Sequence, residues 1–227
     1  MGIPSAVVLL SGGLDSATCM AIASRDLEVH ALTFDYGSRH SREIDAARAL
    51  ARHFGARSHR VVKVDLGAIG GSSLTEHSIP LKGAQSPDKI GKAIPNTYVP
   101  ARNMIFLGIG VALAEAVGAS RVFIGANSVD YSGYPDCRPE FIAAFQRAAE
   151  LGTKAGAEGN PVKIEAPLLR MSKAEIIRKG AELNVPYGLT WTCYSGGKKA
   201  CGRCEACQLR LAGFREAGIR DPVGYED

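Results

Sequence analysis

Four cysteines near the carboxyl end of the chain have the spacing Cys193-x7-Cys201-x2-Cys204-x2-Cys207. Four thiolates at this spacing suit one tetrahedral zinc ion, and because no coordination position then stays open, the metal would be structural. An iron–sulfur cluster also takes four thiolates, so that alternative stays open. Disulfides are disfavoured, because we expect a cytoplasmic protein whose thiols stay reduced.

The second candidate site is the segment LSGGLDS at 10–16, which joins an apolar run to a helical pattern. Backbone N–H groups and the positive end of a helix gather around an anion at such a turn. The glycines allow close approach of the backbone, and the serine hydroxyls can donate to phosphate oxygens. The segment is neither a Walker A loop nor a G-x-G-x-x-G motif. A simple tight turn capped by Ser11 or Asp15 is the alternative.

A framework of alternating strands and helices must position these residues. The apolar patterns predict strands at 6–10, 27–34, 58–64, 121–125 and 162–166, and helices at 14–23, 42–54, 102–117, 139–150, 172–183 and 205–217. Short unbroken apolar runs are typical of strands that are buried on both faces. The alternation therefore predicts an α/β fold with a doubly wound parallel sheet. Segment 67–95, rich in Gly, Ser and Pro, is predicted to be a long insertion.

Composition excludes several classes of protein. The 227 residues carry a net charge of +4, are 46% hydrophobic and 22% charged, and have ordinary globular character. This charge suits an anionic ligand but is weak for a nucleic-acid-binding protein, so we expect no nucleic-acid partner. The longest early apolar run, 6–10, is far below the roughly 20 residues of a spanning helix, so we expect no membrane association.

The arrangement of strand, SGGxDS turn and helix resembles the pyrophosphate loop of the N-type ATP pyrophosphatases. Four further segments narrow the resemblance to the 7-cyano-7-deazaguanine synthase family of queuosine biosynthesis: FDYGSRH at 34–40, YVPARN at 98–103, VDYSGYPDCR at 129–138 and TWTCY at 190–194. The resemblance covers nearly the whole chain. It implies an adenine nucleotide α-hydrolase-like domain at 1–188, a zinc-binding segment at 189–227 that packs on the same core, and a homodimer.

The same resemblance implies an ATP-dependent carbon–nitrogen ligase. Such an enzyme converts 7-carboxy-7-deazaguanine and ammonia into the 7-cyano product through an adenylated carboxylate and an amide. Adenylation is needed because a carboxylate is a poor electrophile with a poor leaving group. ATP, with Mg²⁺, is expected to lie along Leu10, Ser11, Gly12, Gly13, Leu14, Asp15, Ser16, Ala17, Thr18, Cys19 and Met20.

The resemblance also assigns roles outside this turn. Catalytic roles fall to Lys173 and Arg102, and substrate contacts to Asp130, Tyr131, Arg138 and Tyr36. A carboxylate at Asp130 would accept from a guanine-like edge, and a tyrosine would stack on the base. The alternatives are a solvated surface lysine, a packing or interface role for Arg102, and a plain turn residue at Asp130.

Two other functions compete with this one. A tRNA sulfurtransferase would use the same adenylation, but it needs an RNA-binding module and a persulfide-carrying cysteine, and the sequence offers neither clearly. A zinc-ribbon binding module would leave the glycine turn without a role. The ligase therefore remains the preferred hypothesis.

Overall fold

The computed structural model describes residues 3–38, 41–76, 78–81, 94–127 and 134–226. Within these ranges five strands form one sheet in the order β3-β2-β1-β4-β5, and every pair of neighbours is parallel. This confirms the predicted parallel sheet. The strands are β1 (Ser5–Leu9), β2 (Glu28–Asp35), β3 (Ser58–Lys63), β4 (Arg121–Phe123) and β5 (Lys163–Glu165).

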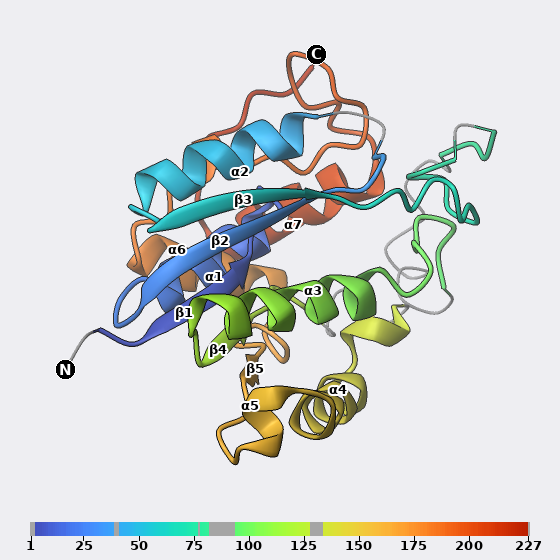
Figure 1. Ribbon diagram of the computed structural model, residues 1–227. Coiled ribbons are helices and arrows are strands. Elements are labelled where there is room, and N and C mark those ends of the chain that lie inside the picture. The colour runs from blue at the N-terminus through green and yellow to red at the C-terminus, as the bar shows by residue number, and fades with distance from the viewer. Residues whose placement is uncertain (1–2, 39–40, 77, 82–93, 128–133, 227) are drawn as a thin grey trace.

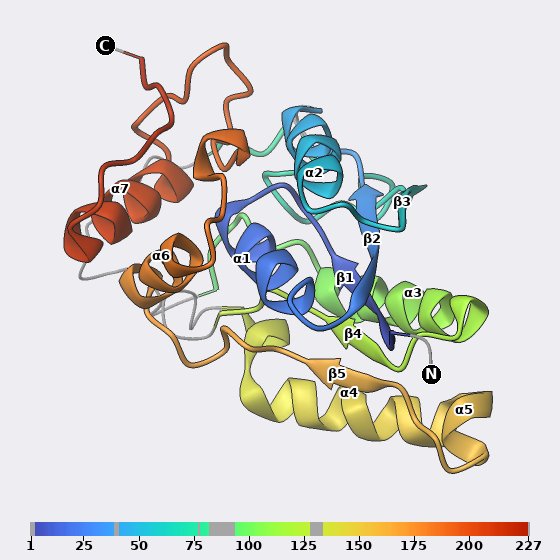
Figure 2. The same ribbon diagram turned by 90° about the vertical axis from the view of Figure 1, so that its left-hand side faces the viewer.

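Helices cover both faces of the sheet (Figures 1 and 2). One face carries α1 (Leu14–Ala23), α2 (Arg42–His53), α6 (Lys173–Glu182) and α7 (Glu205–Ala217), and the other carries α3 (Arg102–Val117) and α4 (Pro139–Gly152), which is followed by the short α5 (Lys154–Ala157). The sheet is therefore doubly wound. Within the described ranges, no helix has both the length and the apolar character that crossing a membrane demands.

The central strand explains why both faces must be covered. Successive side chains of a strand point to opposite faces. Accordingly, Val8 packs in a cluster with Met20 and Ile176, and its neighbour Val7 packs in a second cluster with Leu107. The unbroken apolar run at 6–10 is thus buried on both sides, as predicted.

Helix ends agree closely with the predicted signals. The predicted helices 14–23, 102–117 and 205–217 have the bounds of α1, α3 and α7. The predicted capping box of α6 is present: Ser172 Oγ accepts from the Glu175 amide, and Glu175 Oε2 accepts from the Ser172 amide at 2.7 Å. Ser41, by contrast, is the N-cap of α2 without any cap hydrogen bond from its side chain.

The described part of the predicted insertion packs against the domain. Leu66, Leu74 and Val99 form a small buried cluster, and Ser73 is fully buried with its amide bonded to the Asn96 carbonyl at 2.9 Å. Residue 77 and residues 82–93 lie outside the described ranges.

Strand order places a ligand-binding crevice at one defined point. The chain winds outward from β1 to β2 and β3, and then from β4 to β5 on the other side. In sheets of this kind ligands bind where the order reverses, at the carboxyl ends of the strands. That point lies between β1 and β4, directly beside the glycine turn.

Candidate functional site

A cavity of ≈ 270 Å³ opens at this reversal point. The glycine turn and the start of α1 form one wall, and the end of β4 approaches so closely that a Cβ added to Gly125 would lie 3.1 Å from the Ser16 amide nitrogen. The predicted residues that line the cavity are Leu10, Ser11, Gly13, Leu14, Asp15, Ser16, Tyr36, Arg102 and Lys173.

The glycine turn leaves the start of α1 open to a ligand. Gly13 is the N-cap, and since it has no side chain, no cap hydrogen bond covers the first amides of the helix. Ser11 Oγ lies 3.0 Å from Ser16 Oγ, and Ser16 Oγ donates to the Gly13 carbonyl at 3.0 Å. The two hydroxyls and the first amides of α1 therefore lie together on one wall of the cavity. Groups of this kind at the start of a helix bind anions.

Lys173 joins this anion site from a distant part of the sequence. Its ammonium group donates to both carboxylate oxygens of Asp15 at 2.8 Å, and its side chain is 10% exposed. The solvated surface lysine considered above is therefore wrong. The capping box begins α6 at Lys173 itself, which aims the side chain at the first turn of α1.

The opposite side of the cavity is aromatic and carries a second cation. Phe34 and Phe106 stack at 3.9 Å between ring centroids, and Tyr36 tilts against Phe106 at 5.7 Å. The Arg102 guanidinium lies 5.8 Å from the centre of the Tyr36 ring. Burial, with a smaller contribution from Glu43, raises the pKa of Tyr36 to about 12, so the phenol stays neutral.

Sequence reasoning missed Glu43, which lines the same cavity from the first turn of α2. Burial raises the pKa of its carboxyl to about 7, although the Arg102 charge opposes this shift. Acidic residues are common in the first turn of a helix, where they interact favourably with the helix dipole. The sequence pattern therefore gives no sign of a binding site at this position. Only the tertiary packing shows that this carboxyl faces a cavity.

Other sequence-predicted residues lie elsewhere. Ala17, Cys19 and Met20 belong to the hydrophobic core, and Thr18 is buried, with its hydroxyl bonded to the Leu14 carbonyl at 3.0 Å. Gly12 packs against α2 and does not line the cavity. Arg138 is exposed at the N-cap of α4 and is not among the residues that line the cavity, although its neighbour Cys137 is. Asp130 and Tyr131 lie outside the described residues.

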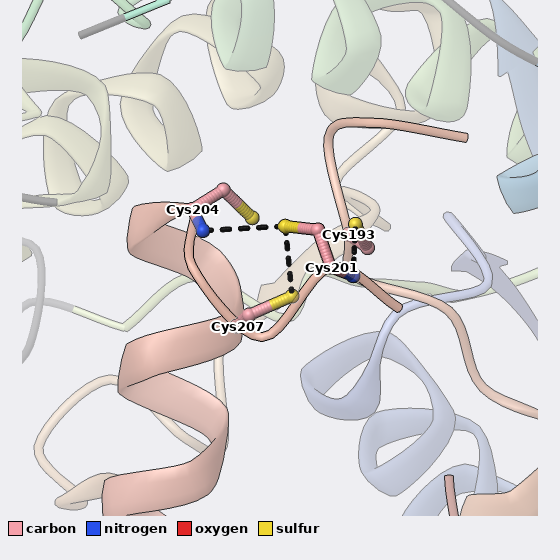
Figure 3. Close-up of side chains that lie close together, drawn as sticks. All are labelled: Cys193, Cys201, Cys204 and Cys207. Atoms are coloured by element: carbon pink, nitrogen blue, oxygen red, sulfur yellow. Dashed lines mark hydrogen bonds between the residues drawn. The ribbon is translucent and has the colours of Figure 1, made fainter. Parts of the chain in front are cut away.

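The four cysteines converge in space (Figure 3). All four sulfurs lie within 4.8 Å of one another, and Cys201 Sγ is 4.0 Å from Cys207 Sγ. Tetrahedral zinc with bonds of about 2.3 Å needs sulfurs about 3.8 Å apart, so the donor set fits the ion. Backbone amides donate to the sulfurs of Cys193 and Cys201, which favours the thiolate form that binds metal.

The cysteine cluster is tied directly to the glycine turn. The Trp191 amide donates to the Gly12 carbonyl at 2.9 Å, and the Trp191 indole N–H donates to the Cys193 carbonyl at 3.0 Å. Arg42, on α2, stacks 4.4 Å from the centre of the Trp191 ring and donates to the Lys198 carbonyl at 2.9 Å. Trp191 and Arg42 therefore connect the cluster with the turn that lines the cavity and with α2.

The shape of the turn depends on Gly12, and alanine in its place is expected to destabilise the fold. Gly12 has φ of +87°, and an added Cβ would lie 2.2 Å from the Glu43 carbonyl oxygen. Backbone strain of this kind costs about 1–3 kcal/mol, and the clash with α2 adds to it. Urea unfolding should show that Gly12→Ala lowers the free energy of unfolding more than Gly118→Ala does. At Gly118 φ is +70°, but the added Cβ meets nothing within 4 Å. Equal losses in the two variants would show that the clash with α2 does not contribute to the destabilisation.

The family model and the relatives similar in sequence point to one family. The family model described as "Queuosine biosynthesis protein QueC" matches residues 5–218. A protein of Anaeromyxobacter dehalogenans named 7-cyano-7-deazaguanine synthase is 55% identical over 97% of this chain and 95% of its own length. A protein of the same name from an Azoarcus species is 55% identical over 99% and 98%. A solved structure of NMN synthetase from Francisella tularensis is 14% identical, with a TM-score of 0.49 over 96% of this chain and 79% of that one.

Proposed function

The chain belongs to the family of queuosine biosynthesis protein QueC, and on that premise we propose that it is a 7-cyano-7-deazaguanine synthase that uses ATP. It converts 7-carboxy-7-deazaguanine and ammonia into the 7-cyano product, through an adenylated carboxylate and an amide. The observation that carries the ATP dependence is the cavity wall in which Lys173 pairs with Asp15 beside the uncapped start of α1. This wall offers a lysine, hydroxyls and helix amides to one anion.

The phosphates of ATP bind at this wall. Amides at the start of α1 donate to the pyrophosphate end, where the helix dipole favours negative charge. The hydroxyls of Ser11 and Ser16, which donate to Ser16 Oγ and to the Gly13 carbonyl in this structure, rotate to donate to the phosphate oxygens when the nucleotide binds. Asp15 orients Lys173 and also offers a carboxylate to the Mg²⁺ that accompanies the nucleotide. Lys173 offsets the charge that develops on the leaving pyrophosphate.

The deazaguanine acid binds on the aromatic side. Arg102 holds its carboxylate, since a guanidinium matches a carboxylate with two parallel hydrogen bonds. Tyr36 provides a ring face for stacking, and Asp130 and Tyr131 are further substrate-binding candidates. The acid then lies between Arg102 and the phosphate wall, which places its oxygen for attack on the α-phosphorus of ATP.

Two activations complete the chemistry. The carboxylate oxygen displaces pyrophosphate from ATP, ammonia replaces AMP to give the amide, and a second activation removes the amide oxygen to leave the nitrile. We propose that the cysteine cluster holds one structural zinc, because all four coordination positions are filled by protein. A homodimer remains a prediction of the family resemblance, and a cytoplasmic location remains a prediction of the sequence pattern.

The function is tested by incubation of the protein with ATP, ammonium and 7-carboxy-7-deazaguanine. Mass spectrometry should find 7-cyano-7-deazaguanine, with AMP and pyrophosphate as nucleotide products. Omission of ATP should abolish the product. Product formation without ATP, or none with all three substrates, would contradict the proposal.

Lys173→Met should lower kcat/KM for ATP about 10²–10³-fold, because it removes a preorganised cation from the phosphates. Methionine keeps the aliphatic stem that packs against Gly213 on α7. Lys179→Met, on the exposed side of the same helix, is the matched control and should leave steady-state turnover unchanged. If both variants behave alike, Lys173 is only a structural partner of Asp15.

A further inference from the structure

The Glu43 carboxyl is the one acidic group of the described cavity lining that has no role in the mechanism above. Asp15 is paired with Lys173 at 2.8 Å, so the charges of these two side chains offset each other. Arg210 also reaches the lining, but it is paired with the buried Asp221 at 2.8 Å. Arg102 is therefore the charged group of the lining that acts on Glu43.

Glu43 lies between the two halves of the site. Its backbone carbonyl packs against Gly12 of the glycine turn, where an added Cβ would lie only 2.2 Å away. Its side chain lines the same cavity as Arg102 and Tyr36 on the aromatic side, and the charge of its carboxyl is coupled electrostatically to both. The acyl carbon of the activated acid must also lie between the glycine turn and the aromatic side, because the acid is held by Arg102 and is activated by ATP at the turn.

Ammonia presents a problem that such a carboxyl solves. At neutral pH the nucleophile is present mostly as ammonium, which has no lone pair and cannot attack a carbonyl carbon. A carboxylate beside the acyl carbon attracts the cation and can remove one proton from it. General bases work best when their pKa lies near the working pH. Burial brings the pKa of Glu43 to about 7, which meets this condition.

We propose that Glu43 is the catalytic residue that binds ammonium and accepts its proton before attack on the activated acid. The inference rests on the proposed function. Ammonium transfers one proton to the Glu43 carboxylate and becomes ammonia. The ammonia lone pair forms the C–N bond, and the C–O bond to the α-phosphate breaks with its electron pair on AMP. The second proton, lost from nitrogen as the amide forms, passes to the departing phosphate.

The test separates activation of the acid from attack by nitrogen. In Glu43→Gln, exchange of labelled pyrophosphate into ATP, driven by 7-carboxy-7-deazaguanine without ammonia, should stay within about 3-fold of the unaltered enzyme. Amide formation from ammonium should fall about 100-fold or more, the usual contribution of a general base. Hydroxylamine is mostly neutral at neutral pH and needs no such base, so it should form the hydroxamate at nearly the unaltered rate.

Asp45→Asn supplies the matched control. Asp45 is an exposed carboxylate in the first turn of the same helix and pairs only with the surface residue Arg48 in the described structure. It should change none of the three rates. In the unaltered enzyme, amide formation at a fixed concentration of ammonium should rise with pH and level off above about 7, as Glu43 becomes ionised. In Glu43→Gln, where only free ammonia can attack, the slow rate should keep rising above pH 7 together with the concentration of free ammonia.

Two failures can be told apart. If the unaltered enzyme shows no pyrophosphate exchange that depends on 7-carboxy-7-deazaguanine, the proposed function itself is wrong. If exchange is present but Glu43→Gln lowers exchange and amide formation equally, or if hydroxylamine does not rescue the variant, Glu43 serves binding or folding and the inference is overturned.

Discussion

Gly13→Val is expected to abolish ATP-dependent turnover while the fold persists. Gly13 has φ of −80°, which any residue adopts, and an added Cβ would meet Ser11 Oγ at 3.4 Å and the Trp191 carbonyl oxygen at 3.7 Å. These are ordinary contact distances, so the fold accepts the side chain. Because Gly13 lines the cavity, the valine methyls would occupy the space in front of the helix amides that the phosphates need.

The expected loss can be given a size. Two charge-assisted hydrogen bonds to phosphate contribute about 1.5–3 kcal/mol each, so their removal should weaken ATP binding at least about 100-fold. Calorimetric titration with ATP measures this, and thermal unfolding tests the fold. We expect the melting temperature to shift by less than about 4 °C, which corresponds to about 1 kcal/mol for a chain of this length.

A control glycine lies on the exposed side of α3. An added Cβ at Gly108 meets nothing within 4 Å, so Gly108→Val should change neither ATP binding nor turnover. Normal ATP binding by Gly13→Val would show that the nucleotide does not use this turn. Together with Gly12→Ala, the series separates the glycine needed by the ligand from the glycine needed by the packing of α2.

Cys204→Ser should cause the largest loss of stability. Structural zinc contributes about 10–16 kcal/mol when it binds its peptide ligands, and most of that energy serves folding. Serine is a poor replacement for a thiolate, so the ion should be lost or weakly held. The purified variant should contain well under one zinc per chain, give less soluble protein and melt at a lower temperature.

Cys19→Ala is the control for this experiment. Cys19 is fully buried in the hydrophobic core and lies outside the cluster, so zinc content should stay near one per chain. Elemental analysis and an absorption spectrum decide the identity of the metal. Iron with sulfide and a broad visible band would contradict the zinc assignment and favour the sulfurtransferase alternative.

The effect of metal loss on catalysis should follow the contacts of Trp191. Its amide holds the Gly12 carbonyl, and its indole N–H holds the Cys193 carbonyl. Loss of the metal is therefore expected to disorder the cysteine segment and, through Trp191, to alter the position of the glycine turn. No direct contact between metal and substrate is needed for this effect. A closed metal site, which has no open position for a water, is therefore expected to affect the activity through the position of the turn.

Features that depend on neighbouring residues could be predicted from the amino-acid sequence alone. Strand and helix periods, the capping box at Ser172, the glycine turn and the four-cysteine spacing are all local patterns. The order of strands and helices was enough to predict a parallel sheet, because parallel strands need crossover helices between them. The family could also be recognised, since its motifs are contiguous segments.

Contacts between side chains that are distant in the sequence could be identified only from the folded chain. Lys173 contacts Asp15 across 158 positions of sequence, and no local pattern distinguishes that lysine from a surface one. Conversely, the period of α1 places the side chains of Ala17 and Met20 on the face that packs into the core. Only residues of the first turn of α1 line the cavity. Glu43 looked like an ordinary residue of a first helical turn. Its raised pKa comes from partial burial in the cavity wall near Arg102, and that burial is set by the packing of α2 and α3 around the end of the sheet.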